Sequence, residues 1–368
     1  VSGAVAERCS IEAYFLYTMV ISAWIYPVVV HWVWSSTGWI SAFNETPTIY
    51  AGAIDFAGSG VVHMVGGFCG LMGAMQLGPR FRRFDTSASA TRSKYYEELM
   101  YQFEFGHNVP FQVLGALILW FGWYGFNAGS TLAAQGAMEL ASKVAVTTTL
   151  AAAAGGLTCA ALAKIFQHKW HIPRVCNGIL AALVSITAGC SVVSPGVSIV
   201  IGVIGALVYY GASNLVERYK IDDPLDAFAV HGCGGMWGVL SAGIFATSEN
   251  VQFAGYSEAL WRDTRHVERF ATQIVLVIVI AGWTIVNAGV LFGVLNWLGI
   301  LRVSEDMERS GIDLHEHGGS AVNMKVPYYV KRGASSEDTQ VARGPQVENA
   351  KDQKRGRAAP GMNEKISE

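Results

Sequence analysis

Residues 55–70 read DFAGSGVVHMVGGFCG, and residues 223–238 read DPLDAFAVHGCGGMWG. Both stretches fit the pattern D-x7-H-x2-G-G-x2-G, so the chain carries one motif twice, around His63 and around His231. Five fixed positions that recur in the same register indicate an internal repeat. In a helix, the positions three, four and seven after each histidine share its face. The motif therefore predicts two helices in which an imidazole stands beside a strip of glycines.

The composition places both helices in a membrane. Of 368 residues, 52% are hydrophobic, 15% are charged and 41 are glycines, which is typical of an integral membrane protein. A net formal charge of -2 without a basic stripe argues against a nucleic-acid partner. Apolar runs long enough to cross a bilayer cover about residues 10–34, 54–78, 107–131, 140–166, 176–195, 197–216, 225–248 and 271–301. The predicted fold class is an all-α polytopic membrane protein with about eight complete spans in this chain.

The two motifs lie five spans apart, so their helices run in opposite directions through the bilayer. An inverted repeat of this kind places its functional site near the midplane, between the two halves. Glycine strips let two helix backbones approach closely, because no side chains separate them. We therefore expect His63 and His231 to meet on the pseudo-two-fold axis.

Two other interpretations of the paired histidines stay open. A buried histidine can be a packing residue, although polar groups at this depth are costly and usually mark a pathway. A zinc or copper site needs more ligands than two imidazoles flanked by Gly, Val, Met and Cys. The six cysteines lack CxxC spacing and are interpreted as reduced packing residues. No metal site is predicted.

Polar and aromatic residues indicate a second site at one end of the spans. Asp55 lies two turns before His63, where a carboxylate can cap backbone groups, favour cations at the entrance, or do both. Trp34, Phe126 and Ser130 lie where the first and third spans end. They fit either an interfacial aromatic belt or a cation site built from ring faces and a hydroxyl. The residues alone leave these interpretations open.

Basic residues predict the orientation of the chain. Ten of them lie in the loops that follow the second, fourth and sixth spans: Arg80, Arg82, Arg83, Arg92, Lys94, Lys164, Lys169, Arg174, Arg218 and Lys220. The loops after the first, third and fifth spans carry none, and the three arginines after the seventh are interleaved with acids. By the positive-inside rule the C-terminus is cytoplasmic. Residues 324–368, with few large apolar groups, are expected to form a disordered cytoplasmic tail.

Five stretches together resemble the ammonium transporter (Amt/Mep/Rh) family, and more closely its Amt branch. They are SGAVAER (2–8), AIDFAGSGVVH (53–63), GWYGFNAGS (122–130), DDPLDAFAVHG (222–232) and GIDLHEHGGSAV (311–322). The resemblance covers about residues 1–323, and five motifs in family order make it highly specific. It implies an eleven-span fold assembled as a trimer, of which the spans here are similar to the fourth to eleventh. We therefore expect residues 1–301 to form a transmembrane domain that lacks the family's first helices.

The resemblance also implies roles for individual residues. It assigns His63 and His231 to the pore, Trp34 and Ser130 to an outer ammonium site, and Phe126 to a gate. We add Asp55 to the predicted ammonium site from its place before His63, and Trp123 to the predicted gate. A second gating phenylalanine belongs to the helices that we expect to be missing. Residues 302–323 resemble a cytoplasmic regulatory segment, in which His315 stands where many plant relatives have a phosphorylatable threonine.

The implied function is ammonium transport by a multi-pass protein of the cell membrane. Ammonium is captured at the outer site, loses a proton, and passes the histidines as neutral ammonia, which avoids most of the roughly 3 to 17 kcal/mol that a charge costs in hydrocarbon. The resemblance implies no enzymatic activity and no cofactor. Its expected partners are ammonium, methylammonium as an analogue, the lipid bilayer, two further copies of the chain and a cytoplasmic regulator. The alternatives are an Rh-like channel for ammonia or carbon dioxide, an ammonium sensor, and a membrane metalloenzyme.

Overall fold

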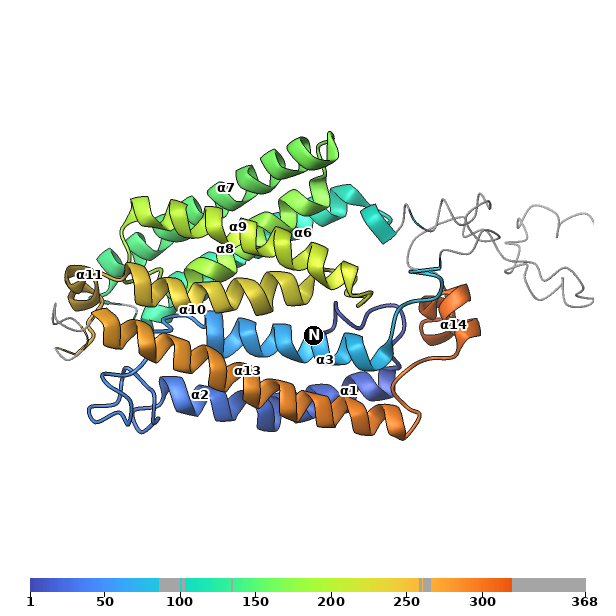
Figure 1. The fold of residues 1–368 in the computed structure, drawn as a ribbon, viewed down its shortest axis with the longest axis horizontal. Coiled ribbons are helices and arrows are strands. Elements are labelled where there is room, and N and C mark those ends of the chain that lie inside the picture. Colours follow the sequence, from blue (N-terminus) through green and yellow to red (C-terminus); the bar gives the residue numbers. More distant parts are fainter. Residues whose placement is uncertain (86–99, 101–102, 134, 258–259, 261–265, 320–368) are drawn as a thin grey trace, which may run out of the picture. The chain divides into compact units, whose positions relative to one another are not determined.

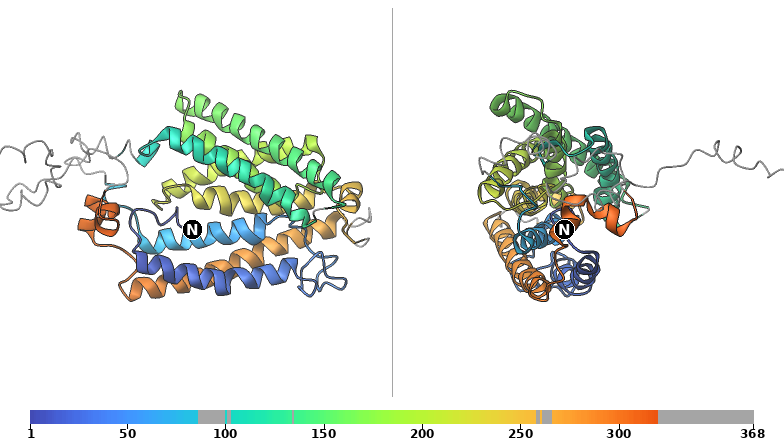
Figure 2. Two further views of the ribbon diagram at one scale, coloured as in Figure 1. Left: turned by 180° about the vertical axis from the view of Figure 1, so that it is seen from behind. Right: turned by 90° about the vertical axis from the view of Figure 1, so that its right-hand side faces the viewer.

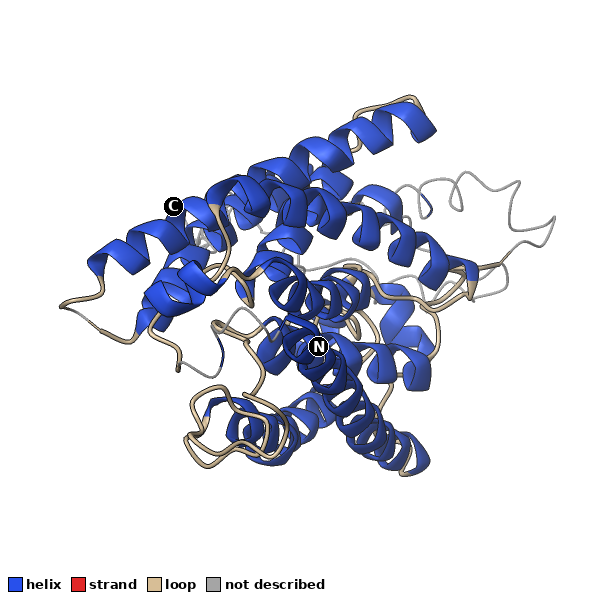
Figure 3. Cartoon of the chain, turned by 60° about the vertical axis from the view of Figure 1, so that its left-hand side comes forward, coloured by secondary structure: helices blue, strands red, loops and turns tan. Residues whose placement is uncertain are grey.

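A computed structural model describes residues 1–85, 100, 103–133, 135–257, 260 and 266–319. These residues belong to one compact unit. Figure 3 shows them as helices joined by loops, and isolated β-bridges join Cys9 to Arg302 and Ser41 to Ala53. The tail predicted at 324–368 lies outside the described residues.

The helices reproduce the spans that hydropathy predicts. In chain order the elements are α1 (Ile11–Val20), η1 (Ile21–Ile25), α2 (Tyr26–Trp34), η2 (Ser59–Met64), α3 (Val65–Leu77), α6 (Val109–Asn127), η3 (Ala128–Thr131), α7 (Met138–Gln167), α8 (Ile172–Thr187), α9 (Pro195–Arg218), η4 (Phe228–Cys233), α10 (Gly234–Phe245), α11 (Ser248–Phe253), α13 (His266–Trp297), α14 (Glu305–Ser310) and α15 (Ile312–Glu316). Within the described residues, seven continuous helices are long and apolar enough to cross a membrane, and α8 is a shorter apolar helix. The prediction of a multi-pass α-helical membrane protein is confirmed.

Local capping explains where several spans begin. The side chain of Ser10 accepts the N–H of Ala13 at the start of α1, and that of Asn108 accepts the N–H of Phe111 at the start of α6. Such caps satisfy backbone donors that have no partner inside the helix. The span predicted at 176–195 is shorter and displaced toward the N-terminus, because the chain leaves α8 after Thr187 and a new helix starts with a proline.

Figures 1 and 2 show the spans side by side along one direction, with α3 and α10 near the middle. α3 packs against α13 and η4, while α10 packs against α13 and η2. Each turn that carries a histidine therefore contacts the helix of the other repeat. α7, α8 and α9 pack against one another as a second group.

The loops alternate between the two ends of the bundle as predicted. In Figure 1 the loop after α3, the start of α6, the end of α9, and α14 lie at the right-hand end. The loop after α2 and the short helix α11 lie at the left-hand end. The described parts of the loops after α3 and α9 thus share one end of the bundle.

A buried ion pair joins three loops at this end. Arg80 donates to Asp222 through its backbone N–H and its Nε, both at 2.8 Å, and the two residues are 8% and 3% exposed. Arg8 is fully buried and donates to the carbonyl oxygen of Asp222 at 2.6 Å. Burial alone would raise the pKa of Asp222, but hydrogen bonds and positive charge from Arg80 outweigh it and hold this pKa below its usual value.

This pair should make stability depend on pH in acid. Because the pKa of Asp222 is lower in the folded than in the unfolded protein, the pair stabilises fully above the unfolded value of about 3.9 and is lost as pH falls through the folded value. Breaking a buried pair costs about 3 to 5 kcal/mol. We expect Asp222→Asn to lower the unfolding temperature of the detergent-solubilised full-length protein at neutral pH, and the deficit to shrink in acid.

The matched control is Glu217→Gln, since Glu217 pairs with Arg83 at 2.9 Å but its side chain is 52% exposed. Exposed pairs contribute about 0 to 1 kcal/mol. Equal unfolding temperatures for the two variants at neutral pH would contradict the assignment.

Candidate functional site

The two histidines of the repeat meet between the halves of the fold. Their Nδ1 atoms lie 3.2 Å apart, and their ring centroids are 5.2 Å apart at an interplanar angle of 18°. For this contact to be a hydrogen bond between neutral rings, one ring carries its proton on Nδ1 and the other on Nε2. The Nε2 atom of His63 is buried and makes no hydrogen bond to any described residue. The pair therefore has unused hydrogen-bonding capacity in an apolar environment.

Both histidines lie on π-helical turns, η2 and η4, which open their spans. Such turns are rare and occur frequently at functional sites. The carboxylate of Asp55 caps η2 by accepting three backbone N–H groups at 2.9 to 3.1 Å, from Gly58, Gly60 and Val61. Asp223 occupies the matching position before η4 and accepts the N–H of Phe228 at 2.7 Å. Of the two roles considered for Asp55, capping is thus observed, and cation attraction stays a prediction.

Glycines let the two repeats touch. A Cβ atom on Gly67 would overlap the amide nitrogen of Gly232, and one on Gly235 would lie 2.5 Å from the carbonyl oxygen of Ser59. Real Cβ atoms do not come this close to backbone, so only glycine fits at these positions. The close approach predicted from the motif is therefore present, and it sets the distance between the imidazoles.

Two aromatic side chains lie against the imidazole of His63. Trp123 stacks on His63 with centroids 5.1 Å apart and an angle of 14°, and Phe126 lies 5.4 Å from the same imidazole. Trp123 and Phe126 are themselves 5.7 Å apart. The structure thus brings Trp123 and Phe126, the residues predicted to form a gate, directly against His63.

A polar network that the sequence did not indicate holds Trp123 in place. Its Nε1–H donates to Thr187 Oγ1 at 3.0 Å, and Thr187 in turn contacts the side-chain oxygen of Asn127 at 3.2 Å. Asn127 donates to Thr148 at 3.0 Å. Thr187, Asn127 and Thr148 are fully buried. Their only signal in the sequence is a polar residue inside an apolar span, which many packing residues share.

Trp34 and Ser130, which were predicted to share an outer ammonium site, bind different segments of the chain. Trp34 donates its indole N–H to the carbonyl oxygen of Asp55 at 2.7 Å, and its ring borders Gly58. Ser130 donates to the carbonyl oxygen of Phe126 at 2.7 Å. Trp34 therefore lies beside the Asp55 cap of η2, and Ser130 is bonded to Phe126. Among the described residues, no hydrogen bond links Trp34 directly to Ser130.

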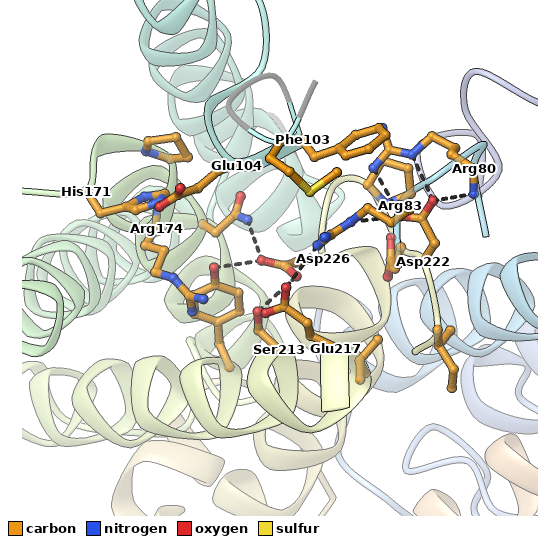
Figure 4. A pocket seen from close by; sticks show the side chains of 18 of the residues that line it. Arg80, Arg83, Phe103, Glu104, His171, Arg174, Ser213, Glu217, Asp222 and Asp226 are labelled. Carbon is orange, nitrogen blue, oxygen red and sulfur yellow. Dashed lines mark hydrogen bonds and ion pairs between the residues drawn. The ribbon is translucent and has the colours of Figure 1, made fainter. Parts of the chain in front are cut away.

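A polar pocket of about 420 Å³ lies at the end of the bundle that holds the buried ion pair, and Figure 4 shows its lining. Five carboxylates and three arginines line it, so the acids are in excess. Asp226 accepts hydrogen bonds from Tyr209 and Ser213, both at 2.9 Å, and from Asn177 at 3.2 Å. Since Asp226 lies two residues before η4, the pocket adjoins the element that carries His231.

The arrangement of potential metal ligands among the described residues bears on the zinc or copper alternative for the histidine pair. Among them, no group of three or more His, Cys, Asp or Glu side chains is arranged to hold a metal ion. A bundle of apolar spans with an inverted repeat, two imidazoles in contact between the halves and aromatic rings against His63 defines a polytopic membrane protein with a site inside the bundle. The sequence profile of the Ammonium Transporter Family matches residues 1–322. The chain belongs to the ammonium transporter family.

Plant relatives and solved structures agree with this assignment. The chain is 39% identical over 335 residues to ammonium transporter 1 member 1 of Solanum lycopersicum, covering 87% of this chain and 66% of that protein. It is 41% identical over 335 residues to ammonium transporter 1 member 1 of Oryza sativa subsp. japonica, covering 87% and 65%. It thus spans just under two thirds of the length of these relatives.

Two solved structures share the fold. A sensor Amt protein matches with a TM-score of 0.72 and 31% identity, over 85% of this chain and 72% of that one. Mep2 of Candida albicans matches with a TM-score of 0.68 and 28% identity, over 83% and 63%. The predicted ammonium-transporter fold is confirmed.

Proposed function

We propose that the protein transports ammonium across a cell membrane and conducts it as neutral ammonia past His63 and His231. The observation that carries the proposal is the imidazole pair, with Nδ1 atoms 3.2 Å apart on the turns where the two repeats cross. Two neutral imidazoles offer both donors and acceptors to a small molecule that can itself donate and accept hydrogen bonds, as ammonia does. The plant relatives named above are called ammonium transporters.

Capture precedes conduction in this proposal. Ammonium binds near Trp34, Ser130 and Asp55, because a ring face and oxygen acceptors attract a small cation. It gives its proton to water at the outer entrance, beside Phe126 and Trp123, which separate this site from His63. Leaving the charge behind spares most of the roughly 3 to 17 kcal/mol that an ion costs in hydrocarbon. The stacked rings next to His63 support this order of events.

Assembly and orientation complete the proposal. The protein forms a homotrimer with one pore in each subunit, and its C-terminus faces the cytoplasm. The shared end of the basic loops supports this orientation under the positive-inside rule. The acid-lined pocket of Figure 4 then faces the cytoplasm, where ammonia recovers a proton.

An ammonium sensor is a second candidate function, because the matched structure with the TM-score of 0.72 is called a sensor Amt protein. Growth of transporter-deficient yeast on low ammonium separates the two. A transporter restores growth and takes up methylammonium, whereas a protein that only senses ammonium does neither. Failure of the full-length protein in both assays, with the protein present at the cell surface, would overturn the transport proposal.

The segment after residue 301 is proposed to couple conduction to the cytoplasm. Glu308 in α14 accepts the N–H of Phe81 at 2.5 Å and pairs with Arg302 at 2.8 Å, and its side chain is only 5% exposed. Arg302 also donates to the carbonyl oxygen of Leu77 at the end of α3 at 2.6 Å. These contacts join the segment to the span that carries His63.

We therefore expect Glu308→Ala to lower methylammonium uptake several-fold while the amount of protein at the surface persists. Leaving the Phe81 N–H without its acceptor costs about 1 to 3 kcal/mol, and Arg302 loses its ion pair while it keeps its bonds to Leu77 and Pro79. Glu305→Ala is the matched control, since Glu305 pairs with Arg309 within the same helix and its side chain is 61% exposed. Equal uptake by the two variants would count against a regulatory segment.

A further inference from the structure

Gln273 makes an unusual set of contacts in the middle of the fold. It lies in α13 and is 2% exposed. Its Oε1 accepts the N–H of Ile54 at 3.0 Å, and its Nε2 donates to the carbonyl oxygens of Ile54 and Val239 at 2.6 and 2.9 Å. Both N–H groups and the carbonyl of the amide are therefore used. Since an amide is costly to bury unless it is hydrogen-bonded, these bonds define one orientation for the side chain.

The residue held by Gln273 directly precedes Asp55. The chain before η2 is not helical, and contacts to other elements fix its path. The N–H groups of Phe56 and Ala57 donate to the carbonyl oxygens of Ala188 and Thr187 at 3.1 and 3.2 Å. Only at Ile54 does one side chain bind both the N–H and the carbonyl oxygen of a residue in this segment. Two bonds to one residue fix the rotation of the chain about its own axis, and hence the direction of the next side chain.

Glycine brings α13 close enough for this contact. A Cβ atom on Gly243 in α10 would lie 2.8 Å from Cγ of Gln273 and 3.1 Å from Cα of Phe270. The helices thus approach closely where the glutamine amide reaches Val239 and Ile54. Packing alone does not require an amide here, because an apolar side chain of the same length would fill the same space.

We infer that Gln273 is a positioning residue that sets the affinity for ammonium through Asp55, an inference that rests on the proposed function. Its amide orients the segment so that the carbonyl of Asp55 faces the Trp34 indole, 2.7 Å away, while the carboxylate of Asp55 caps the turn of His63. Loss of the amide frees the segment to rotate. The capture site then loosens, while the pore beyond it keeps its aromatic stack and its second histidine.

The test measures ammonium uptake over a range of concentrations in the full-length protein, with uptake rates normalised to the protein at the surface. Gln273→Met keeps the length of the side chain and removes all three hydrogen bonds. It should raise the half-saturating ammonium concentration about tenfold, which corresponds to about 1.4 kcal/mol, with the maximal uptake rate changed much less. Gln273→Glu should lie between this variant and the wild type, because a neutral carboxyl group keeps one donor and one acceptor.

Thr272→Val is the matched control. Thr272 is fully buried beside Gln273, but its hydroxyl donates to Glu268 within α13 at 2.8 Å and does not reach the segment before η2. This variant should keep the half-saturating concentration of the wild type.

The outcomes separate this inference from the proposed function. If the wild type takes up no ammonium above the background of cells without the protein, the transport proposal fails. If the wild type conducts and both Gln273 variants keep its half-saturating concentration, the inference is overturned and transport stands. Loss of both Gln273 variants from the membrane while Thr272→Val remains would make Gln273 a folding residue, and it too would overturn the inference.

Discussion

His63→Ala and His231→Ala are each expected to lower ammonium transport roughly tenfold or more, and the double variant to be little worse than the worse single. The reason is the contact between their Nδ1 atoms, through which each ring fixes the tautomer of the other. Removing one imidazole leaves its partner with an unpaired polar group in an apolar site, at a cost of about 1 to 3 kcal/mol. Residues that act as a unit give strongly non-additive effects.

Variants of the two histidines also show whether these residues line a pore or only pack in the core. A His63→Asp change places a fixed acid beside Trp123 and should let bare cations such as potassium leak. His31→Ala is a suitable control, because His31 is an exposed residue of α2, outside the repeat. Ammonium uptake in the two single variants, the double variant and this control measures the first effect, and potassium currents in His63→Asp measure the second. Additive, mild losses with unchanged ion selectivity would mean that the two histidines only pack.

Gly67→Ala is expected to abolish transport, whereas Gly66→Ala should leave it near the wild-type level. The two glycines are adjacent in α3, but a Cβ atom on Gly67 would overlap the backbone of Gly232, and one on Gly66 meets no atom within 4 Å. An alanine at 67 must push the two repeats apart, which separates the imidazoles and opens the core. At 66 the alanine adds helix propensity without a clash.

Uptake of methylammonium and the amount of folded protein in the membrane should be measured for both variants. Gly67→Ala should lose uptake even where some protein is retained, because the spacing of the histidine pair depends on this contact. Equal methylammonium uptake by Gly66→Ala and Gly67→Ala would show that the close contact between the two repeats does not set the distance between the imidazoles.

The internal repeat in the sequence was enough to predict the histidine pair and the glycines beside it. The recurrence of one aspartate, one histidine and three glycines indicated two antiparallel helices in close contact, and the structure places His63 against His231 across Gly67 and Gly235. The hydropathy pattern likewise predicted the spans, since membrane helices must satisfy their backbone groups internally and be apolar throughout.

Other features have no local signal in the sequence. The π turns at both histidines depend on aspartate caps and on packing against the opposite helix, so the residues 59–64 alone do not indicate them. Gln273 and Thr187 act across contacts between distant spans, and a single polar residue in an apolar run does not reveal its partner. For Asp55 the sequence offered two roles, and hydrogen bonds show the capping role directly.

Purified full-length protein in liposomes offers the most direct test of ammonium conduction. The flux of ammonium into these liposomes should be saturable, should be inhibited by methylammonium, and should fall at least tenfold in His63→Ala, the change expected from about 1.4 kcal/mol or more. Liposomes without protein supply the background of ammonia that crosses the lipid directly. A flux that does not saturate, ignores methylammonium and is matched by carbon dioxide would instead indicate a gas channel, and a flux equal to the background would contradict transport altogether.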